Sequence, residues 1–428
     1  MELMGAALVI AGLAASTVGA CGARSELPIP RPPVDPATCD ENFSATAEPV
    51  TLVVFMVFDT SGSMAGETAA GNTKWEAVTE AMTAFLLDPE AAAIRVALSF
   101  FPKHDLMVPA YCQGGWGCEP TSACVPIGYC VPLGGGLCTQ SSQCPDQGDQ
   151  CELMGYCSGT GDPCDPTEVD CEDGDGACTS VGYCSNHTLC DAKDYLIPAL
   201  GTLPDDAPWA LTAITTANID GFTPTLPAFA GAVSSATAWR ENHDKDEVVV
   251  VLATDGVPTL CDPALQSDGL PAAIDNLDAV ATDGLDAGVR SFVIGVFAPP
   301  EEAAATVYLD QIADAGGTSS AFIVSTEQDV AARLLEAFNA VRDVAICEYQ
   351  IPPEGMDFDL TRFRVTITTI GGTAIELERH GSAAECDPVT GGFYYDHDPS
   401  GPTPATRIIL CPASCALEPM ALQVACIP

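Results

Sequence analysis

The part of the sequence with the clearest chemical potential is a short run of carboxylate and hydroxyl residues at 59–63, Asp-Thr-Ser-Gly-Ser. It directly follows an apolar segment, 52–58, that is typical of a buried strand. Carboxylate and hydroxyl oxygens are the ligands that hard divalent cations such as Mg2+ prefer. Taken alone, the run is also what an ordinary turn contains, because Ser and Gly are frequent in turns.

Two later segments place similar side chains in similar positions. One is residues 221–226, Gly-Phe-Thr-Pro-Thr-Leu, and the other is a second apolar strand, 247–253, followed by Thr-Asp-Gly. Each has an ordinary interpretation as a turn or a helix cap. Their weight comes from their order, since D-x-S-x-S, G-x-T-P-T and L-x-T-D-G follow one another along the chain.

In this order the three segments resemble the metal-ion-dependent adhesion site (MIDAS) of von Willebrand factor type A (VWA) domains. The resemblance implies a bound divalent cation, Mg2+ with Mn2+ or Ca2+ as alternatives, and a ligand that is an Asp or Glu carboxylate of a protein partner. In such a site Asp255 acts through water, which leaves the ion with positive character. Many relatives have a glycine where this chain has Phe222. The implied metal ligands are Asp59, Ser61, Ser63, Thr223 and Asp255.

Apolar strand-like and amphipathic helix-like segments alternate along the chain, which predicts an α/β fold with a doubly wound, mostly parallel sheet. In such sheets ligands bind at the carboxyl ends of the strands, where the winding order reverses. The segments that end in Asp59 and Asp255 are expected to lie side by side there. The predicted strands are 52–58, 94–101, 247–253, 290–297 and 321–324, and the predicted helices are about 73–87, 207–217, 225–239, 302–315 and 327–342.

The 21 cysteines indicate an oxidising compartment outside the cytoplasm. Near the start, an apolar stretch too short to span a bilayer ends in Val-Gly-Ala-Cys, which looks like a bacterial lipobox. We therefore predict a lipoprotein signal peptide at 1–21, lipidation of Cys21, and a proline-rich tether at 22–49. This predicts an outer-membrane lipoprotein of the bacterial cell envelope, with a lipid anchor in the membrane. An ordinary secretory signal is the alternative.

A cysteine-rich insertion at 104–190 interrupts the predicted VWA domain, which comprises 50–103 and 191–346. Within the insertion the tripeptide Gly-Tyr-Cys recurs every 27 residues, which indicates tandem modules. The first twelve cysteines divide into three units of four, and each unit is expected to close two disulfides internally. The leftover Cys190 is predicted to pair with Cys261. The insertion is either a spacer or a neighbour of the metal site that restricts what docks there.

Residues 347–428 contain further strand-like segments and five cysteines, so we predict a small disulfide-braced β module. Over its 428 residues the chain has 59 acidic and 15 basic side chains, a formal net charge of -44. Such a charge repels phosphate backbones, so no nucleic-acid partner is expected.

The sequence favours a binding or adhesion protein over an enzyme. It contains five histidines and no H-x-x-x-H pair, G-x-S-x-G elbow or P-loop. Two alternatives stay open. One is a metal-assisted hydrolase, which would need a general base beside the ion. The other is a structural envelope protein in which the ion only braces loops.

Overall fold

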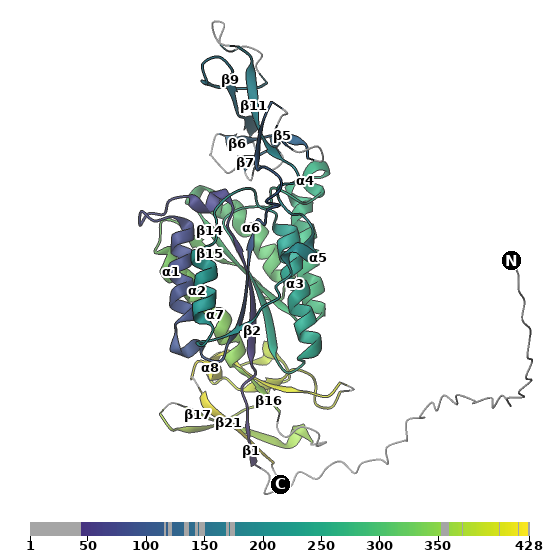
Figure 1. The fold of residues 1–428 in the computed structure, drawn as a ribbon. Coiled ribbons are helices and arrows are strands. Elements are labelled where there is room, and N and C mark those ends of the chain that lie inside the picture. Colours follow the sequence, from purple (N-terminus) through teal and green to yellow (C-terminus); the bar gives the residue numbers. More distant parts are fainter. Residues whose placement is uncertain are drawn as a thin grey trace, which may run out of the picture.

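The computed structural model gives the fold of most of the chain (Figure 1). The predicted signal peptide, Cys21 and most of the tether lie outside the described residues. Among the residues described, no helix combines the length and apolarity needed to cross a bilayer. The description covers 44–426 without 115–116, 119–121, 132–136, 142–143, 145–149, 168–170, 172–175, 352–358, 370, 402, 418 and the side chains of 343–346.

Six strands form the central sheet, and five of them are parallel. Numbered within this sheet along the chain, their spatial order is 3-2-1-4-5-6, so the winding reverses between β2 and β13. This confirms the predicted α/β class with a doubly wound sheet. From one edge to the other the strands are β12 (Gly201–Thr202), β3 (Arg95–Phe101), β2 (Leu52–Asp59), β13 (Glu247–Thr254), β14 (Arg290–Phe297) and β15 (Phe322–Ser325).

Helices cover both faces of the sheet (Figure 1), because β2 is apolar on both. Val54, Met56 and Phe58 pack against one group of helices, and Val53 and Phe55 face the other. Burial on both sides explains why the strand reads as a continuous apolar run. The first group is α1 (Lys74–Leu86), α2 (Ala207–Thr215) and α7 (Val330–Ile346), and the second is α3 (Thr225–Asn242), α5 (Leu270–Asp286) and α6 (Pro299–Ala315).

The five predicted strands and five predicted helices are all present, with ends shifted by a few residues. The two-residue strand β12, the four-residue helix α4 (Ala264–Ser267) and the whole of α5 were not predicted from the sequence. This helix does carry an apolar stripe, formed by Leu270, Ile274, Leu277 and Ala281. Its remaining positions include four Asp, one Asn, one Thr and one Gly, which are weak helix formers, so local propensity conceals a helix that tertiary packing stabilises.

The insertion stands on the carboxyl edge of the sheet (Figure 1). Its repeated glycines have a structural cause, because a Cβ on Gly128 would lie 2.0 Å from Glu152 O and one on Gly182 would lie 2.6 Å from Cys124 Sγ. Only glycine permits the strands to approach so closely. The strands are β4 (Tyr111–Gln113), β5 (Cys124–Pro126), β6 (Gly128–Val131), β7 (Leu137–Cys138), β8 (Gln150–Leu153), β9 (Gly155–Cys157), β10 (Pro163–Cys164) and β11 (Cys178–Cys184).

The predicted grouping of the twelve cysteines is wrong by one position. Two complete units begin at Cys130 and at Cys157, and each pairs its first cysteine with its third and its second with its fourth. The first unit lacks a fourth cysteine nearby, and Cys184 from the end of the array supplies it. Because the cysteines are evenly spaced, the sequence does not show at which cysteine each unit of four begins. The bridges are 112–124, 118–184, 130–144, 138–151, 157–171 and 164–178.

Antiparallel strands form the β module at the opposite end of the sheet (Figure 1). Disulfides join Cys347 to Cys415 and Cys386 to Cys411. One part of the predicted tether belongs to this module, because β1 (Ser44–Ala47) pairs with β21. The sequence did not indicate this strand, since its four small residues show no clear alternation of apolar and polar side chains. The other elements are β16 (Glu348–Gln350), β17 (Phe363–Thr369), β18 (Ala374–Leu377), β19 (Phe393–Tyr395), β20 (Arg407–Leu410), α8 (Pro412–Cys415) and β21 (Pro419–Cys426).

A buried ionic cluster joins this module to the base of the sheet. Arg407 contacts Glu247 at the start of β13 and bonds Glu348 at 2.7 Å, and Arg290 bonds Glu247 at 2.6 Å. Burial opposes the charge on Glu247, but the two arginines outweigh it and lower the pKa of this carboxyl group.

Replacing Arg407 with Met should therefore destabilise the fold by about 3 kcal/mol, because it leaves buried carboxylates with too little positive charge. Urea unfolding at neutral pH measures this loss. As a control, Arg364→Met removes an exposed partner of Glu376 and should cost under about 1 kcal/mol. Equal effects of the two substitutions would contradict the role assigned to the cluster.

Candidate metal centre

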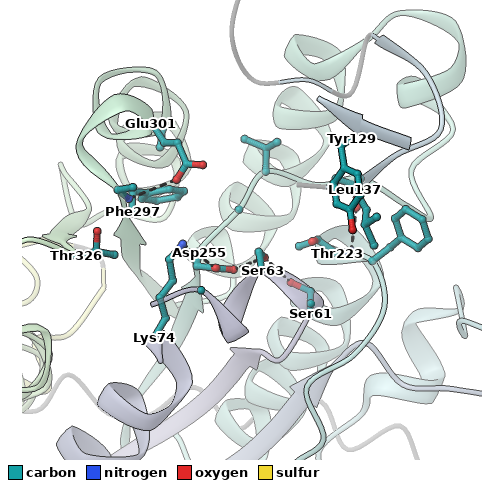
Figure 2. A pocket seen from close by; sticks show the side chains of 18 of the residues that line it. Ser61, Ser63, Lys74, Tyr129, Leu137, Thr223, Asp255, Phe297, Glu301 and Thr326 are labelled. Carbon is teal, nitrogen blue, oxygen red and sulfur yellow. Dashed lines mark hydrogen bonds and ion pairs between the residues drawn. The ribbon is translucent and has the colours of Figure 1, made fainter. Parts of the chain in front are cut away.

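The structure gathers the predicted ligands at the carboxyl edge of the sheet (Figure 2). Ser61, Ser63, Thr223 and Asp255 line one cavity. The fifth residue, Asp59, is fully buried next to them and accepts a hydrogen bond from the backbone N–H of Ser61 at 2.8 Å. Three segments that are far apart in the sequence thus meet where the winding order reverses, as the sheet topology requires.

Hydrogen bonds between loops hold the first two segments together. The N–H of Gly62 donates to the carbonyl oxygen of Gly221 at 3.0 Å, and the N–H of Asp220 donates to that of Thr60 at 3.0 Å. Gly221 has a φ of 80°, a conformation that L-residues rarely adopt. The D-x-S-x-S turn and the loop that carries Thr223 are therefore fixed relative to each other.

The loop after β13 holds Thr223 from the other side. The N–H of Thr223 donates to Thr259 Oγ1 at 2.9 Å, and the N–H of Thr259 donates back to the carbonyl oxygen of Thr223 at 3.0 Å. Between these loops, a Cβ built on Gly256 would lie 3.9 Å from both Ser63 Oγ and Thr223 Oγ1. The two hydroxyl groups therefore border the same space.

The spacing of the oxygens suits a small divalent ion. Ser61 Oγ lies 3.1 Å from Ser63 Oγ, which donates to Asp255 Oδ1 at 2.8 Å. Neighbouring ligands of an octahedral Mg2+ ion, each about 2.1 Å from the metal, lie about 3 Å apart. Hydroxyl and carboxylate oxygens at this spacing fit Mg2+ and suit it better than a soft metal, which prefers sulfur and nitrogen.

The charge at Asp59 also favours a cation. Burial raises the pKa of its carboxyl group to about 7, and the nearby charge of Asp255 contributes to the same rise. Hydrogen bonds from Ser61 and from Thr254 Oγ1, at 2.7 Å, oppose the rise. The two carboxylates of Asp59 and Asp255 repel each other in this buried site, and a divalent cation between them would remove that repulsion.

A lysine that the sequence analysis did not identify completes the site. Lys74 Nζ donates to Asp255 Oδ2 at 3.0 Å, and the two side chains are 9% and 0% exposed (Figure 2). Lys74 is the first residue of α1, which Thr73 and Glu76 cap. Two carboxylates, this ammonium group and a divalent ion add up to a single positive charge. The loaded site would therefore be neutralised by one carboxylate.

Two residues beyond the predicted five support Asp59 and Asp255, and they differ in how visible they are in the sequence. Thr254 lies inside the L-x-T-D-G segment, and its hydroxyl group holds Asp59. Lys74 gives no local signal, because it opens an amphipathic helix and its partner is 181 residues away. Only the folded chain shows that it faces the site.

Comparisons with known proteins find distant structural similarities. No protein-family model matches the chain, and no curated protein matches it. The solved structures that resemble it include a mutant of the PilB minor pilin from Streptococcus sanguinis, the conserved hypothetical protein BatB from Bacteroides thetaiotaomicron, and the SpRpn10 VWA domain. Their TM-scores are 0.37, 0.31 and 0.31, with identities of 13%, 12% and 11%.

These similarities span 69%, 68% and 67% of this chain and 61%, 98% and 94% of the three other chains, in the same order. The chain thus covers less than two thirds of the pilin. At these scores the fold assignment rests on the strand order described above, which is that of a doubly wound α/β domain. The chain adds a disulfide-rich insertion and a C-terminal antiparallel module to this domain.

Proposed function

We propose that this protein is a non-enzymatic binding protein that captures an Asp or Glu carboxylate of a partner protein through a divalent cation. Asp59, Ser61, Ser63, Thr223 and Asp255 would hold the ion, which would supply an open coordination position for the carboxylate. The observation that carries the proposal is the spacing of the three oxygens of Ser61, Ser63 and Asp255, 3.1 and 2.8 Å, inside one cavity.

The charge balance of the site's own residues explains why the ligand should be an anion. Lys74 offsets the charge of Asp255, so the loaded site keeps a positive charge in a protein that is otherwise strongly acidic. A hydrolase would need a general base near the ion, and Glu67 and Glu301, which line the same cavity, are side chains that could serve as one. Turnover is therefore the alternative that the experiment below must separate from binding.

The disulfides indicate that the folded body lies outside the cytoplasm. We further propose that Cys21 carries the lipid anchor and that the protein is an outer-membrane lipoprotein. Its 22–49 segment would link the anchor to the body, with residues from Ser44 to Ala47 already part of the β module.

The test is a pull-down from cell envelope with the purified chain, carried out in Mg2+, in EDTA, and in EDTA followed by excess Mg2+. We expect partner capture in the first and third conditions and at least a tenfold loss in the second, because the carboxylate then has no metal ligand position. Asp59→Ala should capture nothing under any condition. Capture that survives both EDTA and Asp59→Ala would favour a structural role for the ion, and turnover of a substrate would favour the hydrolase.

A further inference from the structure

The insertion forms one wall of the metal-site cavity, which has a volume of about 530 Å3. Tyr129 and Leu137 face each other across the strand pair β6 and β7 and both line this cavity (Figure 2). The oxygens of the metal site therefore border the same space as an apolar surface. The apolar side chains that line it are Tyr129, Leu137, Phe222, Val257, Phe297, Ala298 and Ala305.

This wall is held in place by contacts on both sides of the metal site. Phe222, next to Thr223, is 2% exposed and packs edge-to-face on Tyr183 of the insertion, with ring centroids 4.7 Å apart. On the other side, a disulfide joins Cys190 to Cys261 in the loop after Asp255. The departure from the family pattern at Phe222 therefore has a role, because this ring joins the insertion to the loop that carries Thr223.

The three repeated tyrosines have different environments. Tyr183 is buried against Phe222, and Tyr156 bonds Gln113 Oε1 at 2.9 Å and is not a lining residue of the cavity. Tyr129 lines the cavity and is 50% exposed. An aromatic ring left half exposed beside a charged site has apolar area that a ligand would bury.

The charges around the cavity limit what enters it. Glu67 and Glu301 line it along with Lys74, and the whole chain has a net charge of -44. A ligand with several negative charges would be repelled, whereas one carboxylate accompanied by basic groups would be attracted. A segment of a partner protein provides this combination, because it can place acidic, apolar and basic side chains side by side.

We propose, as an inference that rests on the proposed function, that the partner segment presents its Asp or Glu directly beside a large apolar side chain. Basic residues flank this pair in the partner segment. The carboxylate would occupy the metal site, and the apolar side chain would pack on Tyr129 and Leu137. The insertion is then a specificity element of the binding site and not a spacer.

Four probes test this in calorimetry with Mg2+: acetyl-Lys-Phe-Glu-Lys-amide, the same peptide with Ala for Phe, the same with Gln for Glu, and free 3-phenylpropanoate. With the native chain we expect the Phe-Glu peptide to bind about tenfold more tightly than the Ala-Glu peptide, which is the effect of partly burying one ring. The double variant Tyr129→Ala, Leu137→Ala should lose this preference and keep its affinity for Mg2+ alone within about twofold.

Tyr156→Ala is the matched control, because it removes the equivalent tyrosine of the next repeat and should change neither affinity. Equal binding of the Phe-Glu and Ala-Glu peptides, a preference that survives in the double variant, or tighter binding of free 3-phenylpropanoate would overturn the inference while the proposed function stands. Equal binding of the Phe-Gln and Phe-Glu peptides, or no Mg2+-dependent binding of any peptide, would overturn the proposed function itself.

Discussion

Replacing Asp59 with Asn is expected to weaken Mg2+ binding at least 100-fold and, at the same time, to stabilise the metal-free protein. The loss of affinity follows from removing a charged ligand, since even residues that only support a ligand typically contribute 10- to 100-fold. The gain in stability follows because burial and the charge of Asp255 raise the pKa of Asp59 to about 7. The ionised carboxylate is therefore unfavourable in the fold when no cation is bound.

The pH dependence has a definite sign. The folded pKa of Asp59 lies above its ordinary value of 3.8, so the folded metal-free chain keeps a proton that the unfolded chain releases. The contribution of Asp59 to the stability of the metal-free chain should be fully present below its ordinary pKa of 3.8 and be lost as the pH rises through about 7. Mg2+ binds the ionised form, so its affinity should rise over the same range.

Urea unfolding in EDTA at pH 5 and pH 8, together with Mg2+ titration calorimetry, measures both effects. In Asp59→Asn the difference between the two pH values should shrink. The control is Asp165→Asn, which changes an exposed carboxylate in the insertion and should alter neither measurement. An Asp59→Asn protein that is less stable than the native chain in EDTA at pH 8 would show that Asp59 acts mainly as a structural hydrogen-bond acceptor.

The parts of the site that the sequence does predict are those for which position along a strand is sufficient. Asp59 and Asp255 each follow an apolar strand, and the strand order places the two strand ends side by side. Thr223 required the G-x-T-P-T pattern, because its loop belongs to no strand of the sheet. The fold class was predictable for the same reason, since continuous apolar strands must be covered on both faces.

The remaining features depend on partners that are far away in the sequence. Tyr129 shares its Gly-Tyr-Cys motif with Tyr156 and Tyr183, and the motif does not indicate which of the three tyrosines faces the cavity. The disulfide frame depends on Cys118 reaching Cys184, the last cysteine of the repeats. Local periodicity contains no information of this kind.

Replacing Lys74 with Met is the second change with a large expected effect. It should raise the affinity for Mg2+, lower the affinity for a carboxylate peptide and lower the stability of the metal-free fold. When the ammonium group of Lys74 is removed, Mg2+ no longer competes with a cation bonded to Asp255, so the affinity for Mg2+ should rise about tenfold. The loaded site also loses its net positive charge, so a carboxylate peptide should bind about tenfold more weakly to the Mg2+-saturated protein. In EDTA the fold should lose about 3 kcal/mol, because a buried carboxylate loses its partner.

These three readouts separate a charge-balancing lysine from a merely structural one. If Lys74 only braced α1, its loss would lower stability and weaken Mg2+ and peptide binding together. If it balances the charge of Asp255, Mg2+ affinity and peptide affinity move in opposite directions. Lys193→Met is the matched control, because it removes an exposed lysine whose side chain is 71% accessible and whose partner is Asp191. Since both side chains of that pair are mostly exposed, solvent screening should leave all three measurements unchanged.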